Sequence, residues 1–134
     1  MSRNLLLAAA VTSGLLVGSA AIATPVQAHT LDCSGYEYVE STEVSAGSSS
    51  TPWSHFVAYH LGNIEICLDG SDGAELGLTL QQIVGGEPET VAISQQNGPD
   101  KKLSFYSMEP AVYRVKILGR TGGSYTVGLT LPAA

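Results

Sequence analysis

The segment from Tyr113 to Leu131 constrains the fold more than any other part of the sequence. Apolar and polar residues alternate in it on both sides of residues 119–123, which are rich in glycine. Strict alternation is typical of strands with one buried face, and a glycine-rich break between two such strands predicts a turn. We therefore expect a β-hairpin of two half-buried antiparallel strands, in which Tyr113 and Tyr125 are core residues or cross-strand partners.

The first 28 residues have the pattern of a secretory signal peptide. Arg3 supplies a positive charge, residues 5–17 form an apolar stretch, and residues 26–28 resemble a small-x-small cleavage site. The apolar stretch is interrupted by polar residues and is short for a membrane-spanning helix of roughly 20 residues. We therefore expect export, cleavage near His29, no membrane attachment after cleavage, and a single secreted domain at residues 29–134.

The mature chain is acidic. Without residues 1–28, five basic residues stand against twelve acidic ones, which gives a formal charge of −7. Nucleic acids and anionic membranes attract proteins through positive surface fields, which this composition does not supply. The sequence therefore predicts neither a nucleic acid nor a membrane surface as a partner.

Cys33 and Cys67 are the only cysteines of the chain. Two cysteines in an exported protein predict a disulfide bond, because the oxidising compartment favours it. Their separation differs from the close spacing of a zinc motif, and the residues before Cys33 differ from the small residues of a lipidation site. Closing a loop of this length stabilises a fold by about 3–4 kcal/mol in the chain-entropy model.

The position of Cys67 within its strand predicts where the disulfide lies. Ile64, Ile66 and Leu68 alternate on one face of the expected strand, so Cys67 points to the other face. We therefore expect the disulfide to tie the N-terminal segment across the outside or the edge of a sheet, and not to cross the core.

Short alternating runs separated by Gly, Ser, Asn and Pro occupy most of the mature chain, and helix signals are nearly absent. This is typical of an all-β fold, here an antiparallel β-sandwich of the jelly-roll or immunoglobulin-like kind with about 7–8 strands. In the run at 89–94 we expect Val91 and Ile93 to point inward. Besides the C-terminal pair, strands are expected at 36–44, 53–61, 64–68, 75–81 and 89–94, with a loop at 45–52.

Four segments follow one another in a recognisable order: residues 53–68 (WSHFVAYHLGNIEICL), 75–80 (ELGLTL), 113–117 (YRVKI) and 122–127 (GGSYTV). This order resembles the bacterial pre-peptidase C-terminal domain, over nearly all of the mature chain. Domains of that family are β-sandwiches found behind the catalytic units of secreted proteases and other exported enzymes. The resemblance implies substrate binding, assistance in secretion or attachment to surfaces. We expect it here as a stand-alone secreted protein, since no peptidase sequence precedes it.

The sequence lacks the patterns typical of a catalytic site. His60 is five positions after His55, an odd offset that places the two on opposite faces of a regular strand. No Gly-x-Ser-x-Gly segment occurs, and Ser124 follows two glycines in the expected hairpin turn, without the strand-to-helix context of a nucleophile. We therefore expect no enzymatic activity and no catalytic residues.

Asp69, Asp72 and Glu75 lie close together in a glycine-containing segment. Oxygen ligands gathered in such a turn suit a hard cation such as Ca²⁺, although their spacing is not that of an EF-hand loop. The other interpretation is an acidic turn between two strands that faces solvent. The sequence requires no cofactor and favours the acidic turn; calcium is the one cofactor that it allows, with these three residues as the ligands.

Trp53, the only tryptophan, has two interpretations. It can stack on a sugar ring, with Tyr36, Tyr38 and Tyr106 as further aromatics, or it can fill the core of a small domain. Alternation puts Trp53 on the same face as His55, Val57 and Tyr59, without deciding which face is the core. Trp53 and Tyr106 are the candidate ligand-binding residues.

These features together favour a secreted, non-catalytic binding or accessory protein that contacts an extracellular protein or polysaccharide. The alternative is a small secreted peptidase inhibitor or protease-interacting protein. An inhibitor needs a rigid exposed loop, for which residues 85–90 and 95–102 are the candidates.

Overall fold

The computed structural model describes residues 31–94 and 96–134, and within these ranges it contains nine strands and no helix. The expected signal peptide, residues 1–28, lies outside the described residues. In the described part, no helix is long and apolar enough to cross a membrane. The strands are β1 (Tyr38–Val44), β2 (Ser49–Ser50), β3 (Phe56–Ala58), β4 (Gly62–Gly70), β5 (Leu76–Val84), β6 (Glu87–Ile93), β7 (Asp100–Ser107), β8 (Ala111–Gly119) and β9 (Gly123–Thr130).

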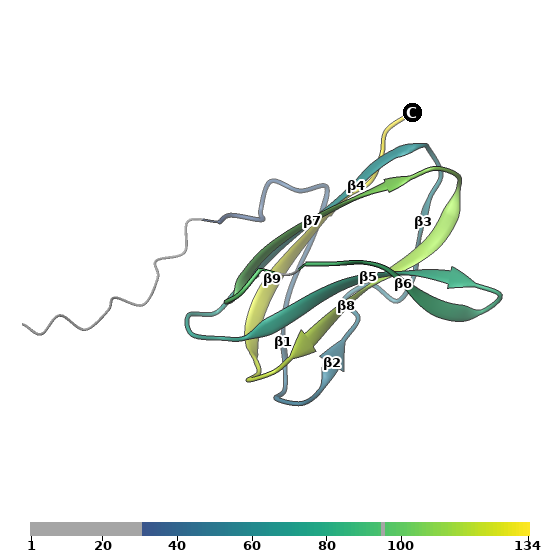
Figure 1. Ribbon diagram of the computed structural model, residues 1–134. Helices are drawn as coiled ribbons and strands as arrows, with labels where there is room; N and C mark the ends of the chain where they lie inside the picture. Colours follow the sequence, from purple (N-terminus) through teal and green to yellow (C-terminus); the bar gives the residue numbers. More distant parts are fainter. Residues whose placement is uncertain (1–30, 95) are drawn as a thin grey trace, which may run out of the picture.

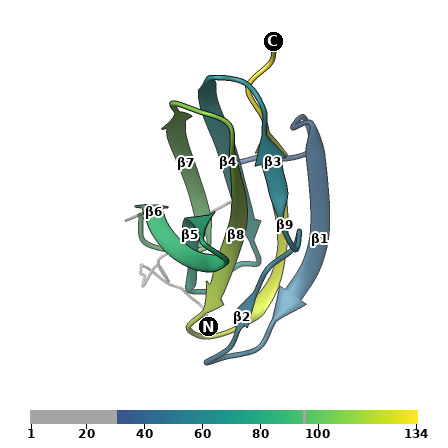
Figure 2. The ribbon, with the colours of Figure 1, turned by 90° about the vertical axis from the view of Figure 1, so that its right-hand side faces the viewer.

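The strands form two antiparallel sheets that pack as a sandwich (Figures 1 and 2). One sheet has the order β1-β9-β4-β7, and the other has the order β2-β8-β5-β6, with β3 also paired to β8. The predicted all-β sandwich is therefore confirmed. The alternating apolar side chains of the central strands meet between the sheets and are almost completely buried: Ile64, Ile66, Leu68, Leu76, Leu78, Leu80, Val115, Ile117, Val127 and Leu129.

The predicted C-terminal hairpin is wrong in its pairing. β8 pairs with β2, β3 and β5, whereas β9 pairs with β1 and β4, so the two strands belong to opposite sheets. The residues between them form an arch, where a Cβ at Gly119 would lie 2.7 Å from the carbonyl oxygen of Ser45. Alternation identifies the buried face of a strand, but not whether the next strand lies beside it or across the core. Tyr113 and Tyr125 are core residues, 2% and 3% exposed, but they are not cross-strand partners.

The strand expected at 53–61 is limited to β3, and the loop expected at 45–52 contains β2. Both strands pair with the same edge of β8, β2 at Ile117 and Leu118 and β3 at residues 111–113. Because they divide this edge, neither strand is long. Phe56 lies opposite Tyr113 and stacks on it, with 6.0 Å between ring centroids. Phe56 and the fully buried Ala58 therefore lie on the face of this segment that points to the core.

β5 and β6 are joined by Gly85 and Gly86, whose φ angles of 60° and 84° are those of a two-residue hairpin turn. Residues 85–90 are thus a tight turn and the start of β6, and all six are exposed, so their role as an inhibitor loop stays a prediction. The register shifts between Leu80 and Gln81, so Leu80 lies opposite Ala92. This bulge reverses the alternation, and Ile93, predicted to point inward, is 54% exposed.

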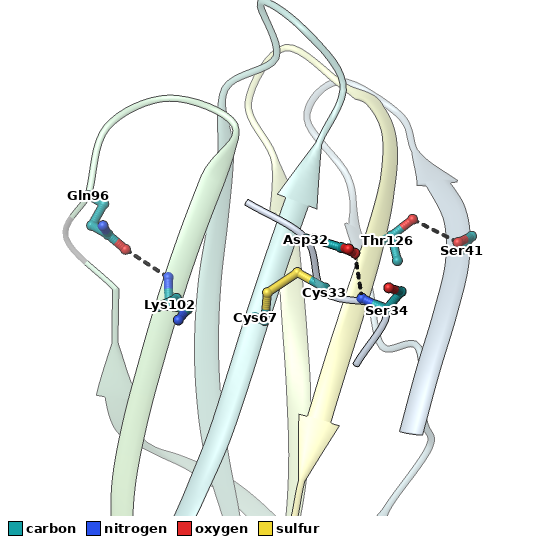
Figure 3. The surroundings of a disulfide bond; sticks show 8 residues. All are labelled: Asp32, Cys33, Ser34, Ser41, Cys67, Gln96, Lys102 and Thr126. Carbon is teal, nitrogen blue, oxygen red and sulfur yellow. Dashed lines mark hydrogen bonds between the residues drawn. A yellow bond between two sulfur atoms is a disulfide. The ribbon is translucent and has the colours of Figure 1, made fainter. Parts of the chain in front are cut away.

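The predicted disulfide joins Cys33 to Cys67, with 5.6 Å between their Cα atoms (Figure 3). Cys67 lies on β4, which has neighbours on both sides in its sheet, and its side chain points away from the sandwich core. The disulfide therefore holds the N-terminal segment across the outside of a sheet, and not at its edge. Both cysteines are at most 1% exposed. The segment also presses Tyr36 against Gly128, where an added Cβ would be 2.7 Å from Tyr36.

A short turn in the same segment follows Asp32. The Ser34 N–H donates to the Asp32 carboxylate at 2.9 Å (Figure 3). Hydrogen bonding to the charged form, by the Ser34 hydroxyl and by this N–H, lowers the pKa of Asp32. The carboxylate therefore stays ionised and helps to shape the chain beside the disulfide.

Candidate functional site

An aromatic groove of about 310 Å³ lies at the open side of the sandwich, between β1 of one sheet and β3 of the other. Figure 2 shows β1 along this side of the molecule, next to β9, with β3 in the facing layer. A concave site with mostly aromatic and apolar walls is the usual form of a ligand site. The groove is lined by Tyr38, Trp53, His55, Phe56, Val57, Tyr59, Leu129 and Leu131.

The floor of the aromatic groove is fixed by the core. Leu129 is 2% exposed, and Trp53 and Phe56 are half-buried and pack against the core cluster. Phe56 stacks on Tyr113, which also meets the edge of the Phe105 ring at a centroid distance of 6.1 Å. The groove therefore rests on side chains whose positions are set by packing from both sheets.

The rim of the aromatic groove is exposed. Tyr38 is 46% exposed and Tyr59 is 70% exposed. Tyr38 lies opposite Leu129 in the pairing of β1 with β9, so both side chains are on the inner face of their sheet. Exposed tyrosines over an apolar floor provide stacking surfaces and hydroxyl groups for a flat or apolar ligand.

The structure separates the two residues that the sequence singled out for ligand binding. Trp53 lines the aromatic groove, whereas Tyr106 lies on β7, opposite Asn63 of β4, on the outer face of the sheet and 54% exposed. The face that carries Trp53, His55, Val57 and Tyr59 lines the groove as a set. His60 is exposed and does not line it.

The three residues predicted to bind calcium are not gathered at one point. Asp69 lies on β4 and lines a pocket of about 330 Å³ together with Ser41, Ser71 and Thr126. Glu75 points elsewhere, where its Oε1 accepts the Gly98 N–H at 3.2 Å. Among the described residues, no three His, Cys, Asp or Glu side chains are grouped so that they can hold a metal ion. Calcium binding stays a prediction.

Lys101 is a buried cation on β7, at the sheet edge opposite β1, and is 3% exposed. Its Nζ donates to the Gly98 carbonyl, so Lys101 and Glu75 together fix the loop before β7. Burial lowers the pKa of Lys101, and the positive charge of Arg120 adds to this, while the negative charges of Glu75 and Asp100 oppose it. The charged amine is thus less stable here than in water.

The buried amine predicts a pH dependence of stability. The folded-state pKa of Lys101 lies below the ordinary value of 10.5, so between these two values the unfolded chain binds more protons. The free energy of unfolding therefore rises as pH increases through this window. We expect Lys101→Met to remove this rise in urea unfolding curves measured between pH 7 and pH 10.

Lys102→Met, at the exposed neighbour on β7, is the matched control and should keep the rise. Burial raises the pKa of Tyr125, so above about pH 10 this tyrosine ionises in the unfolded chain before it does in the folded one. The free energy of unfolding then falls with pH, and the comparison therefore stops at about pH 10. Identical pH profiles for the wild type and Lys101→Met would contradict the assignment of the rise to Lys101.

Comparison with known proteins gives matches in structure but not in sequence. No protein-family model matches the chain, and no curated protein is similar to it in sequence. The pre-peptidase C-terminal domain of collagenase from Bacillus anthracis superposes with a TM-score of 0.57 at 17% identity, over 69% of this chain and 88% of that domain. The fold is that of a pre-peptidase C-terminal domain. The resemblance expected from the sequence is therefore confirmed for the fold.

A second solved structure is similar to the same extent. The Yersinia pseudotuberculosis-derived mitogen matches with a TM-score of 0.54 at 16% identity, over 72% of this chain and 86% of the mitogen. At such low identities the likeness to both structures concerns the fold and not the site. A shared fold does not imply a shared function.

Proposed function

We propose that this chain is a secreted, non-catalytic binding module that contacts an extracellular protein or polysaccharide through the aromatic groove. The observation that carries the proposal is the combination of a packed floor with an exposed rim, Tyr38 and Tyr59. Aromatic rims supply a large contact area at small entropic cost, which suits the flat faces of sugars and the side chains of proteins.

Two further observations support a role outside the cell. The disulfide is stable in oxidising compartments, where exported proteins fold. The similar domain from Bacillus anthracis belongs to a collagenase, which makes an extracellular protein polymer a natural first ligand to test. The acidic composition fits a soluble partner or a neutral polymer better than nucleic acid.

The proposal is tested by retention of the oxidised protein on insoluble collagen, chitin, cellulose and peptidoglycan. We expect one of these polymers to retain the protein, and Tyr59→Ala to weaken retention about tenfold, as for an aromatic residue that contributes much of the binding energy of an interface. Trp53→Ala should have a similar or larger effect, but it also removes packing from the core.

Tyr106→Ala is the matched control, since Tyr106 is an exposed tyrosine outside the groove. It should leave retention unchanged. Loss of retention in Tyr106→Ala with none in Tyr59→Ala would move the site to the outer face of β7.

If no polymer retains the protein and a secreted protease is slowed, the inhibitor alternative replaces the binding module. Repeating the assay with calcium and with a chelator tests the role predicted for Asp69, Asp72 and Glu75.

A further inference from the structure

β1 is the sheet edge with the fewest features that prevent strand addition. Free edges attract other strands, and proteins protect them by short length, proline, lysine or bulges. β2 and β3 are very short, β6 carries Pro88 and a bulge, and β7 carries Lys101 and Lys102. β1 has seven residues in unbroken register with β9, and acidic side chains are the only such device on it; in the described part of the chain no strand pairs with its other edge.

The hydrogen bonds of Gly70 and Ser71 show which backbone groups of β1 face solvent. The Gly70 N–H donates toward β7, to Pro99, at 3.1 Å, and the Ser71 N–H donates toward β9, to Ser124, at 2.9 Å. N–H directions alternate along antiparallel strands, and the registers from β4 through β9 to β1 have no shift. The residues of β1 whose N–H and C=O groups point away from β9 are therefore Val39, Ser41 and Glu43.

The charge of β1 selects what can pair with it. Glu40 and Glu43 lie on β1 and Glu37 precedes it, and residues 37–44 contain no basic residue. Glu40 lies opposite the buried Val127, so it faces the inner side of the sandwich at its open edge. A charge in this position opposes pairing of β1 with a second copy of itself, because acidic groups would face one another. An incoming strand with a lysine or arginine at this point removes that repulsion.

The aromatic groove begins at the same edge. Tyr38, which lines it, is two residues before Glu40 and on the same inner face of β1. A strand added beside β1 would present alternate side chains to this face. The side chain opposite Tyr38 would enter the groove between β1 and β3, and the side chain two residues along would meet Glu40.

We propose that β1 binds an extended polypeptide segment as an additional strand, with a basic side chain at Glu40 and an apolar side chain two residues away in the aromatic groove. This inference rests on the proposed function and names its partner as a protein. A polysaccharide has no peptide main chain that alternates N–H and C=O groups at the spacing of a strand, so it cannot pair with Val39, Ser41 and Glu43 in this way.

The test uses the full-length oxidised protein and a synthetic peptide, acetyl-Thr-Val-Thr-Lys-Thr-Phe-Thr-amide, with binding measured by calorimetry. Antiparallel pairing places its phenylalanine opposite Tyr38 and its lysine opposite Glu40. We expect measurable binding, about tenfold weaker for the same peptide with glutamate in place of lysine, as for a lost charge pair together with a new repulsion. Methylation of the peptide amides that face β1 should abolish binding.

Two variants of the protein test the two parts of the interface. Ser41→Pro removes an N–H from the free edge and should weaken binding about tenfold, whereas Ser41→Ala, which keeps the N–H, should not. Glu40→Lys should reverse the preference, so that the glutamate peptide binds better than the lysine peptide. The Glu40 comparison stands even if Ser41→Pro destabilises the fold.

Absence of binding by the lysine peptide overturns the inference, as does binding that is insensitive to both Ser41→Pro and Glu40→Lys. If a polymer retains the protein through Tyr59 while neither β1 variant affects retention or peptide binding, strand addition is wrong and the binding module stands. If Tyr59→Ala also leaves retention unchanged, the proposed function of the groove is wrong as well.

Discussion

Replacement of both Cys33 and Cys67 by alanine is expected to lower the free energy of unfolding by about 3–4 kcal/mol. The disulfide closes a loop of 34 residues, and without it the unfolded chain gains conformational freedom. Alanine is the appropriate replacement because both side chains are almost fully buried, and a serine hydroxyl would be left there without solvent. For a domain whose total stability is about 5–15 kcal/mol, this is a large fraction.

Urea unfolding of the oxidised wild type and of the double alanine variant measures this difference. In thermal unfolding of the same two proteins, the midpoint temperature should fall by about 12 °C or more, given a shift of about 4–8 °C per kcal/mol for a domain near 100 residues. The wild type measured with a reducing agent is the control and should fall to a similar stability. A loss below about 1 kcal/mol would mean that the N-terminal segment is held by other contacts, or that the unfolded chain is already compact.

The buried faces of the strands could be predicted from the sequence because side chains alternate with a period of two. Leu76, Leu78 and Leu80 belong to the core for this reason, and Cys67 points to the outside because it lies between Ile66 and Leu68. The pairing of strands could not be predicted in the same way. β8 and β9 are adjacent in sequence and belong to opposite sheets, and both arrangements produce the same alternation.

The candidate site could be predicted only in part. The face carrying Trp53 and Tyr59 follows from alternation within one short segment, and this face does line the groove. The opposite wall, Tyr38 with Leu129, comes from β1 and β9 of the other sheet, and no local pattern indicates that these strands meet β3 across the open side. Tyr106 shares only its aromatic ring with Trp53: it lies on β7, opposite Asn63 and outside the groove.

A single residue on β9, Gly128, determines whether the N-terminal segment can lie on the sheet. Gly128 lies between Cys67 of β4 and Val39 of β1, and the space that its missing side chain leaves is filled by Tyr36. A Cβ at this position would be 2.7 Å from Cβ and Cγ of Tyr36 and 2.9 Å from the carbonyl oxygen of Cys33. These distances are shorter than any stable contact, so the segment must move if the residue is changed.

We expect Gly128→Val to lower the free energy of unfolding by about 3 kcal/mol, at the upper end of the cost of overpacking, although valine favours strands. Gly35→Val is the control, since a Cβ at Gly35 meets no atom within 4 Å. Its stability should remain close to that of the wild type. Thermal unfolding of both variants measures the difference.

The loss in Gly128→Val should depend on the disulfide, because the disulfide prevents the N-terminal segment from leaving the sheet. In the double alanine variant the segment can move away, and the valine then meets neither Tyr36 nor Cys33. Gly128→Val should therefore cost less in that background, with a coupling energy of about 1 kcal/mol or more in a double-mutant cycle. Additive losses would show that the valine is accommodated by a shift of β9 itself, and that the disulfide does not hold the segment against Gly128.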